Sequence, residues 1–166
     1  AVSKAFQDLI SQVYRKSYGL NIIITRMFSY TNARRKNLFM SAFADQIVRI
    51  ERGKLKILQH GNLNSIRCFL DIDDAMNAYW LTAKYGKVGE IYNIGGSKII
   101  SVKGYLKELT KLSKKKIFLK LNPKLLRPQD VTLQLPNVNK FKKDVKWKPK
   151  VPFKESVKKL LEDCRK

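Results

Sequence analysis

The segment from Leu20 to Met27 constrains the fold most, because it is almost continuously apolar and rich in β-branched residues. Its sequence, LNIIITRM, is typical of a strand that is buried on both faces of a parallel sheet. Apolar residues recur at intervals of three and four over residues 1–18, which predicts an amphipathic helix that Gly19 closes. A helix that leads into such a strand predicts an α/β layer.

The rest of the chain continues to alternate between helical and strand patterns. After a polar loop over 29–37, helices are predicted over 38–52, 72–84, 102–112, 138–144 and 153–164. Strands are predicted over 56–59, 66–70, 90–94 and 117–121. Gly53 ends the first of these helices, Asp71 and Ser101 cap the second and third, and Gly61 with Asn62 turns the chain between the first two strands.

Length and charge narrow the class of protein. The chain has 166 residues, which is the size of one compact domain or of part of a larger one. Its net charge is +22, with a larger excess after residue 100, yet 44% of its residues are hydrophobic. This apolar content excludes a disordered polycation, which could not build a core.

Cysteine and histidine are too scarce for a disulfide framework or a zinc cluster. The chain has only Cys68, Cys164 and His60, with no Cys-x-x-Cys pair. The longest apolar run, around Leu20 to Ile24, is far shorter than a membrane span. We therefore expect a soluble, cytoplasmic protein that needs neither a metal nor a membrane.

Several short motifs follow one another along the chain. Ala-Val-Ser-Lys ends at Lys4, Tyr-Gly-Leu-x-x-x-x-x-Arg-x-Phe runs from Tyr18 to Phe28, and Gly-Glu-Ile-Tyr-Asn-Ile-Gly runs from Gly89 to Gly95. In this order they resemble motifs of the extended short-chain dehydrogenase/reductase family, also called the NAD-dependent epimerase/dehydratase family. Within it, the chain is most similar to GDP-mannose 4,6-dehydratases and GDP-4-keto-6-deoxymannose reductases.

The resemblance implies a catalytic and cofactor-binding role for Lys4. The family has a Tyr-x-x-x-Lys motif at the start of this helix, and the tyrosine would fall one residue before Ala1. Residues four apart share a helix face, so the ammonium can lower the phenol pKa and let the tyrosinate act as acid or base. Without the resemblance, Lys4 would be read as a solvated cation.

The loop after the apolar strand resembles two further family features. Ser29 stands where these enzymes have an asparagine near the sugar, and Phe39 matches a substrate-site phenylalanine. Arg34 and Arg35 match arginines that help bind the dinucleotide phosphate. The alternative reading of the two arginines is a solvated basic loop.

Two more segments resemble the parts of the family that hold the nucleotide. Asn62 and Arg67 lie in a Gly-Asn-Leu-x-x-x-Arg segment whose arginine grips the substrate diphosphate. Arg127 and Asp130 lie in an Arg-Pro-x-Asp-Val segment whose arginine holds nucleotide phosphates and whose acid reaches a ribose. A forked guanidinium suits this role because it donates paired, charge-assisted hydrogen bonds to phosphate oxygens.

The fold implied by the resemblance is α/β: the last helix and strand of a Rossmann-type parallel sheet, followed by a small mixed α/β substrate-binding domain. Residues 1–28 would be the remnant of the dinucleotide-binding domain, and residues 29–166 would mainly bind the nucleotide sugar. We expect the chain to be the C-terminal half of a GDP-sugar-modifying enzyme, and helix 1–18 to form a homodimer or larger homo-oligomer.

The parent enzyme would oxidise or reduce the sugar at C4 with NADP, or with NAD. The chain has no glycine-rich strand-to-helix turn of the kind that binds dinucleotides, so the main cofactor motif is absent. We therefore expect the chain by itself to be inactive.

Two functions of other classes remain open on the sequence. A net charge of +22 would suit a nucleic-acid-binding module, although no recognition motif is present and the aromatic residues lie mostly at core spacing. Ser29, Ala33 and Cys68 depart from the family pattern, which would suit a non-catalytic relative kept as a structural or oligomerising subunit.

Overall fold

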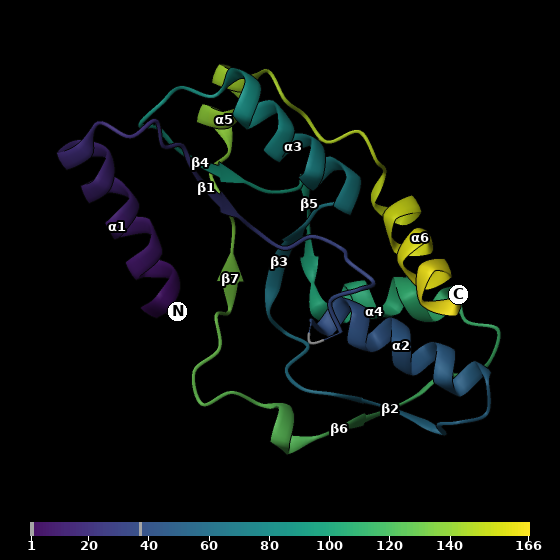
Figure 1. Cartoon of the computed structure of the whole chain (residues 1–166). Coiled ribbons are helices and arrows are strands. Elements are labelled where there is room, and N and C mark those ends of the chain that lie inside the picture. The colour runs from purple at the N-terminus through teal and green to yellow at the C-terminus, as the bar shows by residue number, and fades with distance from the viewer. Residues whose placement is uncertain (1, 37) are drawn as a thin grey trace.

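A computed structural model describes residues 2–36 and 38–166 of the chain (Figure 1). Ala1 and Asn37, at the ends of the first predicted helix and of the polar loop, lie outside the described residues. The first helix, α1, spans Val2–Tyr18, and Gly19 after it has a left-handed φ of 65°. The predicted helix and its glycine cap are confirmed.

The remaining helices begin and end within a few residues of their predicted bounds. They are α2 (Phe39–Glu51), α3 (Ile72–Tyr85), α4 (Val102–Lys111), α5 (Asn139–Val145) and α6 (Phe153–Arg165), with a short 3₁₀ turn η1 (Pro123–Leu125). The Asp71 carboxylate accepts a hydrogen bond from Asp73 N (2.8 Å), and the Ser101 hydroxyl accepts one from Gly104 N (3.0 Å). Both predicted caps are therefore confirmed.

The strands are short and form three small sheets. They are β1 (Ile24–Met27), β2 (Ile57–His60), β3 (Ile66–Phe69), β4 (Ile91–Ile94), β5 (Lys98–Ser101), β6 (Phe118–Leu121) and β7 (Leu133–Gln134). β1 pairs with β4 and β2 pairs with β6, both in parallel. β3 lies between an antiparallel β5 and a parallel β7. Parallel pairs joined through helices give the α/β class that was predicted.

The strand predicted over Leu20 to Met27 is shorter and less buried than expected. Only Ile24–Met27 forms a strand, its residues are half-buried or exposed, and Leu20 is 45% exposed. Among the described residues β1 has one partner, β4, on one edge. A strand is buried on both faces only where other elements pack on both sides of its sheet, so the expectation of full burial is wrong for this chain.

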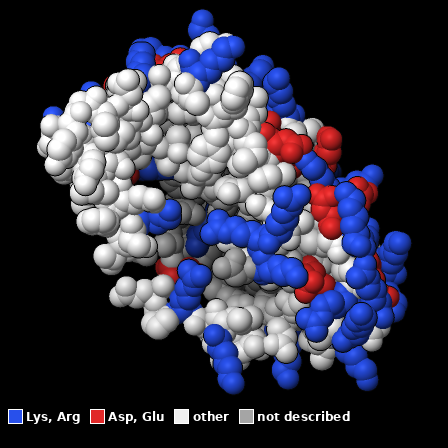
Figure 2. All heavy atoms as spheres, in the orientation of Figure 1, with Lys and Arg blue, Asp and Glu red and all other residues white. Residues whose placement is uncertain are grey.

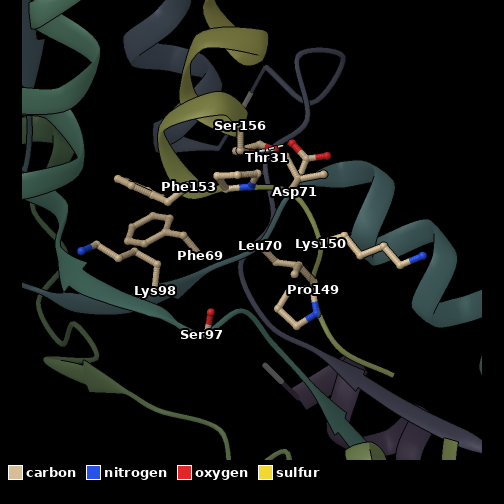
Figure 3. A pocket seen from close by; sticks show the side chains of 12 residues that line it. Thr31, Phe69, Leu70, Asp71, Ser97, Lys98, Pro149, Lys150, Phe153 and Ser156 are labelled. Carbon is tan, nitrogen blue, oxygen red and sulfur yellow. Dashed lines mark hydrogen bonds between the residues drawn. The ribbon is translucent and has the colours of Figure 1, made fainter. Parts of the chain in front are cut away.

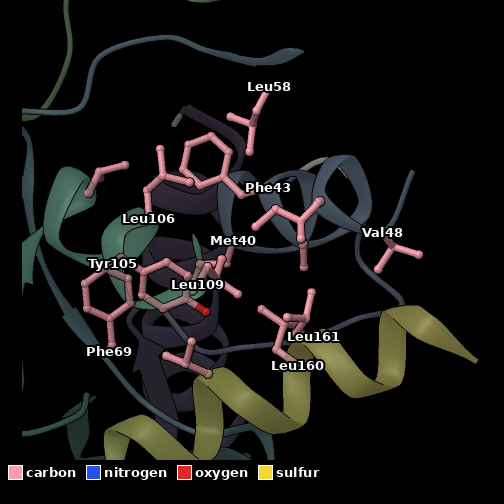
Figure 4. Close-up of a cluster of buried hydrophobic side chains, with 14 of the residues drawn as sticks. Met40, Phe43, Val48, Leu58, Phe69, Tyr105, Leu106, Leu109, Leu160 and Leu161 are labelled. Carbon is pink, nitrogen blue, oxygen red and sulfur yellow. The ribbon is translucent and has the colours of Figure 1, made fainter. Parts of the chain in front are cut away.

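The main core lies where α2, α4 and α6 pack around β2 and β3 (Figure 4). Ile47, Leu58, Leu109 and Leu161 are fully buried in it. A second core, with Tyr92 and the other buried residues of its cluster, lies between β4, α3 and α5. Each helix contributes one apolar face, as its three-and-four spacing predicts.

Helix α1 has no buried residues and lies to one side of the molecule (Figure 1). Asp8 connects it to β1 by accepting hydrogen bonds from Arg26 Nε (2.7 Å) and Nη2 (3.1 Å). The apolar positions of α1, such as Phe6 and Leu9, are 64% and 63% exposed. The predicted amphipathic helix is present, and its apolar face is uncovered within the described residues.

Candidate functional site

A cleft of about 510 Å³ lies where α2, the loop between β2 and β3, and the segment after η1 meet. The structure brings into its lining most of the residues predicted to bind substrate, although they are far apart in the sequence. These are Phe39, Asn62, Arg67, Arg127 and Asp130.

Part of the cleft wall is a hydrogen-bonded polar cluster centred on Asp130. Its Oδ2 accepts hydrogen bonds from Ser65 Oγ (2.8 Å) and Asn62 Nδ2 (2.8 Å). Its Oδ1 lies 3.5 Å from Arg67 Nη2. The Ser65 hydroxyl, followed by Asn62 and the charge of Arg67, lowers the pKa of Asp130 below its ordinary value. Asp130 is therefore ionised at neutral pH and fixes the groups around it.

Arg67 is held in the cleft wall from two sides. Nη1 donates a hydrogen bond to Ile66 O (2.9 Å), and Nη2 forms the ion pair with Asp130. Cys68, the residue after this arginine, is 1% exposed, and burial raises the pKa of its thiol. Asp130 thus orients the guanidinium in this chain, from a distant part of the sequence.

The cleft also has an apolar part of its lining, made by Leu38, Phe39, Ala42 and Leu125. The Phe39 ring is supported by Phe69 and Tyr105, with ring centroids 6.1 Å and 6.0 Å away. A cleft lined by both arginine and apolar side chains fits a ligand with a phosphate group and a flat ring.

Gly61 brings the wall at Leu125 close to the end of β2. A Cβ at Gly61 would lie 2.6 Å from Leu125 O, so no side chain fits between the two backbones. The asparagine after it forms a turn, in which Asn62 Oδ1 accepts a hydrogen bond from Asn64 N (2.9 Å). The Gly-Asn pair predicted as a turn therefore also shapes the cleft.

The other predicted site residues do not line this cleft. Lys4 is exposed on α1, where Nζ donates a hydrogen bond to Gln7 Oε1 (2.8 Å). Ser29 follows β1, and its carbonyl accepts a hydrogen bond from Leu70 N (3.1 Å). Arg34 and Arg35 are exposed in the loop before α2. The residues predicted for the cofactor are not gathered into one pocket, so the described residues do not by themselves form a dinucleotide site.

Some lining residues were missed by the sequence analysis, namely Gln46, Gln59, Ser65 and Leu125. None of them lies in a motif position that the resemblance marks. The only sequence signal is that Gln59 is a polar residue at the end of a predicted strand, next to the Gly-Asn turn.

A second pocket of about 320 Å³ lies between the end of β3 and the start of α6 (Figure 3). Its buried polar groups are occupied by one another: Ser156 Oγ donates to Asp71 Oδ2 (2.6 Å) and lies 3.1 Å from Thr31 Oγ1. The side chains of Lys98 and Lys150 extend away from it in opposite directions. These contacts join α6 to the start of α3, which indicates a structural role.

Lys and Arg side chains are spread over the face shown in Figure 2, and several gather near its centre. Acidic side chains are fewer and lie mostly toward one side of this view. Within the described part of the chain, no three His, Cys, Asp or Glu side chains are grouped so that they could hold a metal ion. None of the described helices is long and apolar enough to cross a membrane.

Comparison with protein-family models gives a match to the model described as GDP-mannose 4,6 dehydratase over residues 1–160. A similar curated relative is GDP-6-deoxy-D-mannose reductase of Pseudomonas aeruginosa, which is 23% identical over 98% of this chain and 54% of its own length. The chain therefore spans about half the length of the curated relatives it matches. The matches do not favour the nucleic-acid-binding alternative.

Solved structures confirm the fold. The structure of RMD from Pseudomonas aeruginosa complexed with NADPH has a TM-score of 0.89 and 20% identity, covering 99% of this chain and 55% of that one. The dTDP-glucose 4,6-dehydratase from Bacillus anthracis in complex with NAD has a TM-score of 0.79 and 23% identity, covering 97% and 50%. The arrangement of helices and strands is thus that of Rossmann-type dehydrogenase/reductase relatives, as predicted.

Proposed function

Because the chain belongs to the GDP-mannose 4,6 dehydratase family, we propose that its cleft binds the nucleoside diphosphate part of a GDP-sugar. The observation that carries the proposal is the mixed lining of the cleft. Arg67 and Arg127 line it, where a diphosphate would find paired donors, together with the apolar side chains of Phe39 and Leu125. The Asp130 cluster holds Arg67 in place for this role.

The whole enzyme, on this proposal, dehydrates or reduces a nucleotide sugar by oxidation or reduction at C4, with NADP or NAD as cofactor. The two solved relatives, one named with NADPH and one with NAD, support the nicotinamide cofactor.

On the same proposal, residues 1–28 belong to the dinucleotide-binding domain and residues 29–166 mainly hold the nucleotide sugar. The sequence contains no glycine-rich dinucleotide loop, so this chain alone is proposed to be inactive. Its scarce cysteines support a cytoplasmic location.

Calorimetric titration of the chain with GDP, GDP-mannose and UDP-glucose tests the nucleotide site. We expect saturable binding of GDP and GDP-mannose, stronger than that of UDP-glucose. The Arg127→Ala variant should bind GDP about tenfold more weakly, since one charge-assisted contact to phosphate is lost. Absence of any nucleotide binding by the folded chain would overturn the proposal.

We also propose that the uncovered apolar face of α1 pairs with a second copy of the chain. Val2, Phe6, Leu9 and Val13 are exposed at helical spacing on this face, which is unusual for an isolated molecule. Sedimentation velocity should show a dimer or larger species, and Phe6→Glu with Leu9→Glu should shift it to monomer. Lys16→Glu, in the last turn of the same helix, is the control variant, because it also introduces a glutamate into α1. A wild-type chain that sediments as a monomer at all concentrations would contradict this proposal.

A further inference from the structure

A network of side-chain amides forms part of the cleft wall. Gln46 of α2 and Gln59 of β2 both line the cleft. Gln46 Oε1 accepts a hydrogen bond from Gln59 N (2.8 Å), and Gln46 Nε2 donates one to Gln59 O (3.1 Å). Both the oxygen and the nitrogen of the Gln46 amide thus bond to the backbone of Gln59, so Gln46 holds Gln59 in position.

The orientation of the Gln59 amide is set by Asn122. Asn122 Oδ1 accepts a hydrogen bond from Lys124 N (3.0 Å), so the other atom of that amide, Nδ2, is a donor. Nδ2 donates to Gln59 Oε1 (2.7 Å). The acceptor of Gln59 is therefore occupied, while its Nε2 makes no hydrogen bond within the described part of the chain. With Oε1 already accepting from Asn122, the groups that Gln59 leaves unpaired are chiefly the two N–H donors of Nε2.

The Gln59 donor matters because apolar side chains that could hold a base line the same cleft. Phe39, Leu38 and Leu125 line the same cleft as Gln59 and offer apolar surface to a planar ring. A ring whose edge carries a carbonyl can accept a hydrogen bond from Gln59, as guanine O6 or uracil O4 can. A ring that carries an amino group there, as adenine and cytosine do, places donor against donor and leaves both without a partner, which is costly in a cleft.

We propose that Gln59 selects nucleotides by the base, favouring a base with a carbonyl over one with an amino group at the same position. The inference rests on the proposed function, because it requires the diphosphate to bind Arg67 and Arg127 in the same cleft. It adds to that function a specificity-determining residue, together with Gln46 as the residue that positions it.

Two matched pairs of nucleotides test the inference. GDP and ADP are purine diphosphates that carry oxygen or an amino group at C6, and UDP and CDP differ in the same way at C4. Calorimetry with the full chain should show that GDP binds about tenfold more tightly than ADP and that UDP binds more tightly than CDP. A tenfold difference corresponds to the free-energy cost of one unpaired hydrogen-bonding group. Each pair keeps ring size constant, so the preference reports the hydrogen bond.

Gln59→Leu supplies the decisive variant, because leucine has a similar size and no donor. The hydrogen bonds between Gln46 and the backbone of residue 59 do not depend on the side chain at residue 59. The ratio of GDP to ADP affinity should fall from about tenfold to about one, while circular dichroism stays unchanged. Gln7→Leu, on exposed α1, should keep the wild-type ratio.

Inorganic pyrophosphate separates failure of this inference from failure of the proposed function. If pyrophosphate and all four nucleotides bind with similar affinity, the phosphate site stands and base selection by Gln59 is overturned. If Gln59→Leu keeps the wild-type ratio, the inference is likewise wrong. If neither pyrophosphate nor GDP binds, the proposed function fails and the assignment of Gln59 fails with it.

Discussion

Replacing Arg67 with alanine is expected to weaken GDP binding by about 10- to 100-fold without unfolding the chain. The Arg67 side chain is only 12% exposed, so its charge is poorly screened by water. Hydrogen bonds between charged groups contribute about 1.5–3 kcal/mol each, and 1.4 kcal/mol corresponds to tenfold in affinity. The variant also leaves Asp130 without its ion pair, and this carboxylate then repels a diphosphate. Calorimetric titration of wild type and variant measures the loss.

Two further variants make this result specific. Arg67→Lys keeps the positive charge but loses the planar fork, so its affinity for GDP should lie between those of wild type and Arg67→Ala. Arg49→Ala removes the same charge from a side chain that is 52% exposed and does not line the cleft, and it should change affinity less than about twofold. Equal losses in Arg67→Ala and Arg49→Ala would show that only net charge attracts GDP.

Local patterns predicted the helices well because the residues that define a helix lie close together in the sequence. Spacing of apolar residues gave their buried faces, and Asp71, Ser101, Gly19 and Gly53 marked their ends. The two unpredicted strands are of a different kind. β5 and the two-residue β7 are strands only because they flank β3 in one sheet. Such short strands are defined by pairing with distant segments, which no local pattern contains.

The candidate site was predictable only where a family motif covered it. The resemblance marked Asn62, Arg67, Arg127 and Asp130, and the structure places all of them around one cleft. It gave no sign of Ser65, whose hydroxyl completes the Asp130 cluster, because its role exists only once the two segments meet. The same holds for the Gln46 and Gln59 amides, whose donor and acceptor roles depend on neighbours that are distant in sequence.

Gly96→Ala should be the most damaging single-methyl change in the chain, with an expected loss of about 3 kcal/mol or more in the free energy of unfolding. Gly96 lies between β4 and β5, and a Cβ there would lie 1.7 Å from Phe69 O and 3.0 Å from Leu70 N. Both contacts are backbone atoms at the end of β3, so no side chain can move aside. Relief requires the β4–β5 turn to separate from β3, which would disturb the Phe69 ring stacked on Tyr105 (4.7 Å).

Gly104→Ala is the matched control, because it adds the same methyl group at another glycine. Gly104 lies in the first turn of α4, and a Cβ there would meet its nearest neighbour at 3.5 Å, an ordinary contact. Alanine favours the helix over glycine, so this variant should gain about 0.5–1 kcal/mol. Urea unfolding followed by circular dichroism measures both variants. The critical result is that the two variants change the free energy of unfolding in opposite directions. If Gly96→Ala unfolds at the wild-type urea concentration, the close approach of β3 to the β4–β5 turn is wrong. The support that Phe69 gives to Phe39 in the cleft wall is then wrong as well.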